Sequence, residues 1–401
     1  MIELSRELQI AVVGHLCVDL TPQFEGRSAS RLTDIMRPGR LNYVGPLTVS
    51  TGGAVSNVGI SLARLGANVK MMAKVGDDSL GATAISIVGR YSSDVSAIVR
   101  TGDSTSYSVV LAPPGTDRIF FHHPGCNDTF SLEDIDLHSL SECCIFHFGY
   151  PTLMRRMYRN GGEELTKVLQ AAKQCGVTVS LDMAMFDPST DAAREDWRGI
   201  LLRSLPSVDV FLPSLEECVM MMRPEYYARF SDYSDEQRDL ETPAIALELA
   251  REFVDMGVAV AGIKCGALGY CVVTGDRDRI DNMGRARPVD SDSWSGRQLW
   301  SPGYWADTIK SATGAGDSSI AGFLMSLACG QSIETASNAA CAVGWQNLRA
   351  VDAFSGVGTW QETLEMIEAG RPRNQVRLPD GWRWCSERGV WTGPLDRSAE
   401  S

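Results

Sequence analysis

The sequence lacks several signatures that would assign it at once. No Gly-Lys pair occurs anywhere, which excludes a Walker A loop because that loop needs Gly-Lys-Ser/Thr. Eleven cysteines are scattered without any Cys-x-x-Cys spacing, so we expect reduced thiols, no structural disulfide and no zinc site. No apolar run approaches the length of a membrane span, and the acidic N-terminus does not resemble a signal peptide. These absences predict a cytoplasmic protein with no membrane partner.

Basic residues are also fewer than acidic ones. The chain has 37 Lys and Arg against 50 Asp and Glu, a net charge of -13. Nucleic acids and anionic membranes need a basic face, so neither is expected as a partner, and small molecules fit better. The length of 401 residues and 44% hydrophobic content allow one large α/β domain with an appendage, or two domains.

The most informative stretch is 312–317, which contains Gly314, Ala315, Gly316 and Asp317 and runs directly into a predicted helix. That helix is indicated by apolar residues at three- and four-residue spacing, namely Ile320, Phe323, Leu324 and Leu327. Backbone N–H groups in the first turn of a helix lack intrahelical partners, and the helix dipole is positive there. Glycines let the loop close tightly around an anion, so the stretch is a candidate phosphoryl-binding site.

Asp317 has two interpretations. Its carboxylate could accept the proton of an attacking hydroxyl, or it could only stabilise the helix dipole, by about 0.3–1 kcal/mol. In either case the helix terminus favours the charged form, so we expect Asp317 to be ionised at neutral pH. A dinucleotide fingerprint would instead need an acid at the end of a second strand, and Glu334 lies in a predicted helix start.

Polar residues near the N-terminus form a second candidate site. Asp19 follows the apolar run 10–14, where ligand groups gather at the carboxyl edge of a parallel sheet. Gly52 and Gly53 open another predicted helix and allow a substrate close to the backbone, while Asn57 offers a donor and an acceptor to a polyol. The alternatives are a turn-stabilising Asp19 and an Asn57 that only caps its helix.

Strands and helices alternate from residue 144 to residue 212, which predicts a parallel sheet covered by helices on both faces. The helices are expected at 162–174 and 191–202, and a strand at 208–212. Residues 213–217 then begin a helix that places Glu217 where a magnesium-bound water could bind it.

Other segments depart from this alternation. The stretches 21–49 and 106–121, the second with a turn at 113–117, predict a small β lid. Residues 223–242 are interpreted as an inserted surface segment and 276–298 as a loop. The tail after residue 370 lacks periodicity, but its tryptophans predict that it packs on the fold.

Together these motifs resemble the ribokinase-like (PfkB-type) carbohydrate kinase family. The two signatures of that family correspond to 52–57 with 62–66, and to 312–317. Weaker matches lie at 76–81, 213–217 and 264–269, so the resemblance extends from about residue 10 to residue 369.

The resemblance implies a three-layer αβα sandwich with a small β lid, ATP as donor, Mg²⁺, and a sugar or nucleoside as acceptor. The kinase domain would span 1–370, with the lid from about 20–50 and 104–123, followed by a C-terminal extension at 371–401. A homodimer formed through the lid is an expectation of the same kind. Transfer would be in line, with most of the acceleration coming from positioning and charge stabilisation.

Site residues carry over by their position in the motifs. The catalytic base corresponds to Asp317, and the anion hole to Gly314, Ala315 and Gly316. The substrate-binding positions are Asp19, Gly52, Gly53 and Asn57. The nucleotide positions are Ser214, Lys264, Gly266, Gly269 and Asn338, and the metal position is Glu217.

Two positions differ from the family pattern. Ser214 stands where the family has Asn in its Asn-x-x-Glu motif, and Ser311 replaces an Asp often associated with a monovalent cation. Ser214 also keeps an alternative open, a sugar-binding or regulatory protein that has lost turnover, which the intact Asp317 and glycines oppose. A dinucleotide-dependent oxidoreductase is a third possibility.

The charge of the acceptor can also be predicted. Asp19 would accept hydrogen bonds from hydroxyls and repel a phosphate, so we expect a neutral polyhydroxylated acceptor. Three lid arginines would reverse this expectation if they gathered at the site: Arg37, Arg40 and Arg118.

Overall fold

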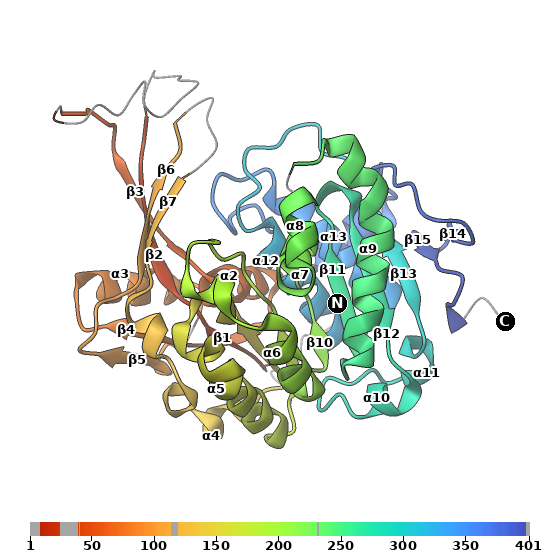
Figure 1. The fold of residues 1–401 in the computed structure, drawn as a ribbon, viewed down its shortest axis with the longest axis horizontal. Helices are drawn as coiled ribbons and strands as arrows, with labels where there is room; N and C mark the ends of the chain where they lie inside the picture. The colour runs from red at the N-terminus through yellow and green to blue at the C-terminus, as the bar shows by residue number, and fades with distance from the viewer. Residues whose placement is uncertain are drawn as a thin grey trace.

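The computed structural model describes residues 9–24, 39, 41–92, 94–113, 119–230 and 232–397. Within them, one large sheet has the strand order β14-β15-β13-β12-β11-β10-β9-β8-β1-β4-β5, with helices on both sides (Figure 1). Its strands are β1 Gln9–Gly14, β4 Asn68–Gly76, β5 Ile98–Thr101, β8 Ile145–Gly149, β9 Thr178–Leu181, β10 Val210–Phe211, β11 Val260–Lys264, β12 Tyr270–Thr274, β13 Gln298–Ser301, β14 Arg383–Cys385 and β15 Val390–Thr392.

The strands from β5 to β11 pair in parallel, as the strand–helix alternation predicts. The remaining strands, β12, β13, β15 and β14, pair antiparallel along the other edge. Parallel strands end at the same sheet edge, so the residues that follow β1, β8 and β9 lie near one another.

Neighbouring residues in the central strands face different cores, which makes the fold a three-layer sandwich. Val12 and Ile145 pack in one core, with helices α2, α3, α12, α13 and α14. Val13 and Phe146 pack in the other, with α5, α6, α7 and α9. The first set is α2 Ala54–Leu65, α3 Ser79–Val88, α12 Ala315–Ala328, α13 Ile333–Asn347 and α14 Trp360–Glu368; the second is α5 Arg155–Gln174, α6 Trp197–Ser204, α7 Leu215–Met222 and α9 Asp235–Asp255.

Several predicted boundaries are wrong for local reasons. The expected helix at 191–202 is a 3-10 turn, Asp191–Arg194, followed by α6, because the Asp196 side chain accepts a hydrogen bond from the N–H of Gly199 and starts a new helix. Residues 223–242 do lie mostly at the surface, as expected, but they hold α8 Pro224–Phe230 and the first part of α9, which a Ser234 capping box initiates. The expected loop 276–298 contains α10 Arg277–Asp281 and α11 Ser291–Trp294, each capped by an aspartate. A further short helix is α4 Leu137–Leu140.

A second sheet stands apart from the sandwich at the upper left of Figure 1. It has the order β3-β2-β6-β7, and its strands are β2 Cys17–Pro22, β3 Leu47–Gly52, β6 Tyr107–Leu111 and β7 Ile119–His123. The predicted hairpin is present as the antiparallel pair β6 and β7, although residues 114–118 of its turn lie outside the described residues, as do 25–38 and 40. Phe120 and Phe121 on β7 are more than half exposed.

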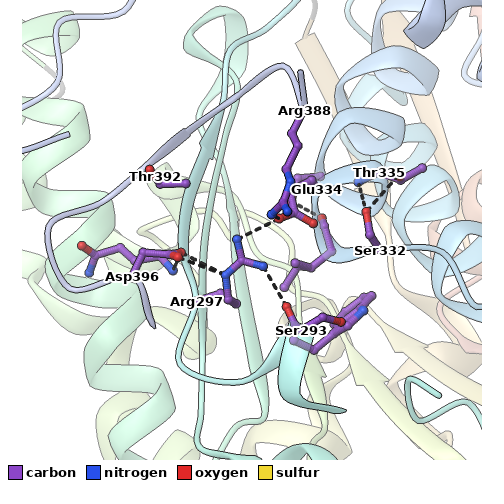
Figure 2. Close-up of polar contacts among 12 residues, drawn as sticks. Ser293, Arg297, Ser332, Glu334, Thr335, Arg388, Thr392 and Asp396 are labelled. Carbon is purple, nitrogen blue, oxygen red and sulfur yellow. Dashed lines mark hydrogen bonds and ion pairs between the residues drawn. The ribbon is translucent and has the colours of Figure 1, made fainter. Parts of the chain in front are cut away.

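The tail packs on the fold, as its tryptophans predict, and it adds β15 and β14 to the large sheet beside β13. Figure 2 shows the charged network that fastens it. Arg297 is buried and donates from Nε to Asp396 Oδ2 at 3.1 Å and from an NH2 nitrogen to Glu334 Oε1 at 2.8 Å. Arg388, in the turn between β14 and β15, donates to the same Glu334 oxygen at 2.7 Å. Burial alone would raise the pKa of Glu334, but the two arginines hold it below its usual range.

Among the described residues, no helix combines the length and the apolar character needed to cross a bilayer.

Replacing Arg297 with Met should destabilise the protein by about 3–5 kcal/mol, because two buried carboxylates would lose their shared cation. The matched control is Arg277→Met, which removes an exposed pair with Asp292 and should cost at most about 1 kcal/mol. Urea unfolding of both variants measures the difference. If both variants lose the same small amount of unfolding free energy, the Arg297 network does not stabilise the packing of the tail.

Candidate active site

Helix α12 begins at Ala315, and its N-cap, Gly314, has φ 71°. A side chain at Gly314 would be strained by this backbone and would also collide with Ala353. Gly316 and Asp317 therefore occupy the first turn, where backbone N–H groups lack intrahelical acceptors. The glycines open the helix as the sequence predicts, and a helix start of this geometry is suited to an anion.

The Asp317 side chain is 6% exposed and is held by two helices and a strand end. Asn57, on α2, donates from Nδ2 to Oδ2 at 2.9 Å, and the Tyr150 hydroxyl lies 2.7 Å from Oδ1 and 2.9 Å from Oδ2. The structure thus joins two predicted site residues that are 260 positions apart in sequence.

The helix terminus alone predicts the wrong direction for the pKa of Asp317. Burial raises this pKa, and the hydrogen bond from Tyr150, the charge of Lys264 and the hydrogen bond from Asn57 oppose the rise without cancelling it. Asp317 is therefore a stronger base than a solvent-exposed aspartate.

Lys264, at the end of β11, supplies a positive charge beside the glycine loop. Its Nζ donates to Asp182 Oδ1 at 2.8 Å, and a Cβ placed on Gly316 would lie 3.7 Å from its Cε. Burial alone would lower the pKa of Lys264, but Asp182 and Glu217 raise it, so the ammonium is charged at neutral pH. A negative phosphoryl group at the loop would meet both this cation and the helix start.

A cavity of about 640 Å³ opens beside this cation. It is lined by most of the predicted nucleotide and anion-hole residues, namely Ser214, Lys264, Gly266, Gly269, Ala315 and Gly316. Trp345 and Leu348 contribute an apolar wall, and Asn374 from the tail contributes an amide. Its volume and its apolar wall with few polar groups are typical of a site for a small organic ligand.

Asn338 is not among the residues that line this cavity. Its amide oxygen accepts from Ser301 and Arg373, and its Nδ2 donates to the Arg388 carbonyl at 2.8 Å. The structure therefore places Asn338 where it holds the tail against the sheet.

Asp19 lies on β2, with its carboxylate against the backbone of Gly52. Ser108 hydrogen-bonds Asp19, and its hydroxyl also lies 3.1 Å from Nδ1 of His122. Burial raises the pKa of Asp19, whereas the hydrogen bonds from Cys17 and Ser108 act in the opposite direction.

His15, directly after β1, lies beside Gly53 and is 2% exposed. No described group lies within hydrogen-bond distance of either of its ring nitrogens, and Oδ1 of Asn57 is likewise unpaired. Burial, and to a lesser extent His122, lower the pKa of His15 to about 3, so its imidazole is neutral. A buried neutral ring with two unpaired nitrogens is suited to hydroxyl groups of a bound molecule.

Glu217 is the third residue of α7, and its Oε2 accepts from the Ser214 N–H at 2.7 Å in a capping box. Burial raises its pKa, and Lys264 opposes the rise. In the described part of the chain, no group of three or more His, Cys, Asp or Glu side chains could hold a metal directly. Mg²⁺ that binds through waters and ligand phosphates needs only one or two protein carboxylates.

Sequence reasoning missed Asn374 of the tail and three residues at the edge of the sheet: His15, Tyr150 and Asp182. Each of the three lies directly after a buried parallel strand, β1, β8 or β9. The sheet-edge rule that singled out Asp19 could have found them. Asn374 has no such signal, because its place depends on how the tail folds back.

The fold is a three-layer α/β sandwich, and its site combines a buried carboxylate at a glycine-opened helix start with a lysine and an adjoining cavity. Residues 7–356 match the model of the pfkB family of carbohydrate kinases, and the chain belongs to this family. The resemblance expected from the motifs is thereby confirmed, as is the class of enzyme, a carbohydrate kinase.

Individual relatives are distant. An uncharacterized sugar kinase of Archaeoglobus fulgidus is 23% identical over 69% of this chain and 89% of its own length. Fructokinase-1 of Zea mays is also 23% identical, over 47% of this chain and only 56% of its own length.

Solved structures confirm the ribokinase-like fold. Ribokinase from Thermotoga maritima aligns with a TM-score of 0.63 at 17% identity, covering 90% of this chain and 99% of its own. Fructokinase with bound ATP from Xylella fastidiosa aligns with a TM-score of 0.64 at 19% identity, covering 90% and 98%.

Asp317→Asn should lower kcat by about 10²–10⁴-fold if the carboxylate takes a proton, since an amide cannot. Because the pKa of Asp317 is raised on folding, its stabilising contribution is present below the unfolded pKa and is lost as pH rises through the folded pKa. The side chain of Asp317→Asn does not ionise and so does not lose this stability. The thermal midpoint of the variant at neutral pH should therefore equal or exceed that of the wild type.

Asp235→Asn, in the exposed first turn of α9, controls for the loss of an acidic residue at a helix start and should leave kcat unchanged. A near wild-type kcat for Asp317→Asn, with a lowered thermal midpoint, would reduce Asp317 to a helix-stabilising residue.

Proposed function

We propose that this protein is an ATP-dependent kinase that phosphorylates a hydroxyl of a small neutral sugar or nucleoside. The observation that carries the proposal is the buried Asp317 carboxylate at a glycine-opened helix start, where Ala315 and Gly316 line the cavity and Asn57 donates to the carboxylate. Two similar structures support ATP as donor: the fructokinase from Xylella fastidiosa has bound ATP, and a ribokinase from Arabidopsis thaliana is complexed with ribose and ATP.

The donor would bind with its base in the 640 Å³ cavity, against Trp345, and its phosphates toward Lys264. The first-turn N–H groups of α12 and the Lys264 ammonium would stabilise the charge on the transferred phosphoryl oxygens. Glu217 is the carboxylate that would hold Mg²⁺ through water, and the ion would supply positive charge against the phosphates.

The acceptor hydroxyl would hydrogen-bond to Asp317 on the opposite side. Its oxygen forms the new bond to the terminal phosphorus while the bond from that phosphorus to the β,γ-bridging oxygen breaks, and ADP leaves. The hydroxyl proton passes to Asp317. In a loose transfer the hydroxyl becomes acidic only as its bond to phosphorus forms, so until then the carboxylate mainly orients it.

The acceptor side favours a neutral molecule. Asp19 would repel a second phosphate, and His15 is neutral because its pKa lies at about 3. The three arginines that could reverse this preference, Arg37, Arg40 and Arg118, lie outside the described residues.

The small sheet is proposed to act as a lid over the acceptor. Its strands β2 and β3 contain two predicted acceptor residues, Asp19 and Gly52, so the sheet begins at the proposed acceptor site. A lid that excludes water would limit hydrolysis of the donor. Pairing of two lids in a homodimer, residues 371–401 as an extension to the kinase domain, and a cytoplasmic location remain proposals of the same kind.

A sugar-binding protein without turnover is the second candidate, and Ser214 favours it. In the structure Ser214 caps α7 and lines the cavity, but it lacks the reach of the asparagine amide expected at this position.

A coupled assay of ADP release, run over neutral sugars, nucleosides and sugar phosphates, tests the function. We expect turnover with at least one neutral polyhydroxylated acceptor and little with its phosphorylated form. Turnover of a sugar phosphate, with the parent sugar inert, would contradict the predicted acceptor. Saturable sugar binding without ADP release would favour the binding protein.

A further inference from the structure

Tyr150 has a backbone conformation that side chains seldom adopt. It directly follows β8 and has φ 66° and ψ 39°, in the left-handed region, immediately before Pro151 of the 3-10 turn Pro151–Leu153. Among the described residues, only Tyr150 and Asn160 combine a side chain with a positive φ. Such strain persists where the surroundings fix the backbone, and it often accompanies a functional constraint.

The chain on both sides of Tyr150 is firmly held. Gly149 packs so closely on Ala54 of α2 that a Cβ at this glycine would overlap the alanine side chain. On the other side, Thr152 donates from Oγ1 to the Ala184 carbonyl at 2.7 Å and accepts from the Ala184 N–H at 3.1 Å. The backbone on either side of Tyr150 is therefore fixed by contacts with two other parts of the fold.

This constraint brings the phenol to the predicted catalytic base. The hydroxyl lies 2.7 Å from Oδ1 and 2.9 Å from Oδ2 of Asp317, while Asn57 donates to Oδ2 at 2.9 Å. Burial and the charge of Asp317 raise the pKa of Tyr150 well above its usual value, so the phenol remains a donor. Two donors on different elements thus set the plane of one carboxylate, and each oxygen has two lone pairs, so acceptor capacity remains.

We propose that Tyr150 is a positioning residue that orients the Asp317 carboxylate so that a free lone pair meets the acceptor hydroxyl. The proposal rests on the proposed function, because it assigns Tyr150 a part in the same transfer. The ring also lies 6.0 Å, centre to centre, from that of His15, so the same side chain forms part of the wall on the acceptor side.

The other charged groups around Asp317 come from three elements. Lys264 at the end of β11 favours its ionised form, and Asp182 after β9 disfavours it. Glu217 on α7 interacts with Lys264 and Asp182. The Tyr150 hydrogen bond is the largest of the contributions that lower the pKa of Asp317, so its loss should raise that pKa.

Tyr150→Phe keeps the ring and removes only the hydroxyl. We expect kcat to fall by about 10-fold to 100-fold, as for a misplaced catalytic group, with little change in the KM of the acceptor. The acid limb of the kcat pH profile should move to higher pH, since Asp317 would bind its proton more tightly. Tyr91→Phe, on a ring that packs against Phe354 outside the site, is the control and should leave kcat and the limb unchanged.

Two results would overturn the proposal. In the first, the acid limb of the kcat pH profile does not move and kcat stays within about twofold of wild type, a minor rate effect. Tyr150 would then be a packing residue. A raised KM with an unmoved limb would make it an acceptor contact instead.

A second measurement does not require turnover. Carbon-13 NMR of the aspartate carboxyl groups, with Asp317→Asn assigning the signal, gives the pKa of Asp317 directly in the wild-type and Tyr150→Phe proteins. A higher pKa in the variant supports the orienting hydrogen bond even if no acceptor in the panel reacts, and an equal pKa contradicts it. The ADP-release assay therefore tests the proposed function, and the NMR titration tests the role of Tyr150 independently of it.

Discussion

The site depends on one buried hydrogen bond, from Asn57 on α2 to Asp317 on α12. Both helices begin at glycines with positive φ, Gly53 and Gly314, which let their first turns come close to neighbouring backbone. Behind the bond the two helices also meet through Ser61 and Ser318, whose hydroxyls lie 3.3 Å apart. Residues 260 positions apart in the sequence therefore meet at one carboxylate, the point where we propose that donor and acceptor meet.

Charge balance is the second constraint. Lys264 is the cation that faces Asp182, Glu217 and Asp317, so this part of the site carries more negative than positive side chains. Burying carboxylates without enough cations is costly, and a divalent ion that arrives with a nucleotide would reduce the imbalance. Burial itself raises the pKa of Asp317, although the residue lies at a helix N-terminus and the charge of Lys264 opposes the rise.

Local chemistry allowed much of this to be predicted from the sequence. Glycines before apolar helices indicated both helix starts, and continuous apolar runs indicated the parallel sheet. The pKa direction of Asp317 depends on burial by distant elements, so no local pattern shows it. The sheet-edge rule could have placed Tyr150 near the site, but not its role, which depends on a strained backbone and on Asn57 and Asp317, both remote in sequence. Strands β14 and β15 have three residues each, too few for a recognisable period, and they form because β13 and the Arg297 network hold them.

The most direct measurement is a crystal structure with Mg²⁺, a non-hydrolysable ATP analogue and the best acceptor. The base should lie against Trp345 and the terminal phosphate at the N–H groups of the first turn of α12. An acceptor hydroxyl should lie within hydrogen-bond distance of Asp317 and in line with the terminal phosphorus, about 3–3.5 Å from it. Phosphates bound away from residues 314–317, or an acceptor that does not reach Asp317, would contradict transfer at this carboxylate.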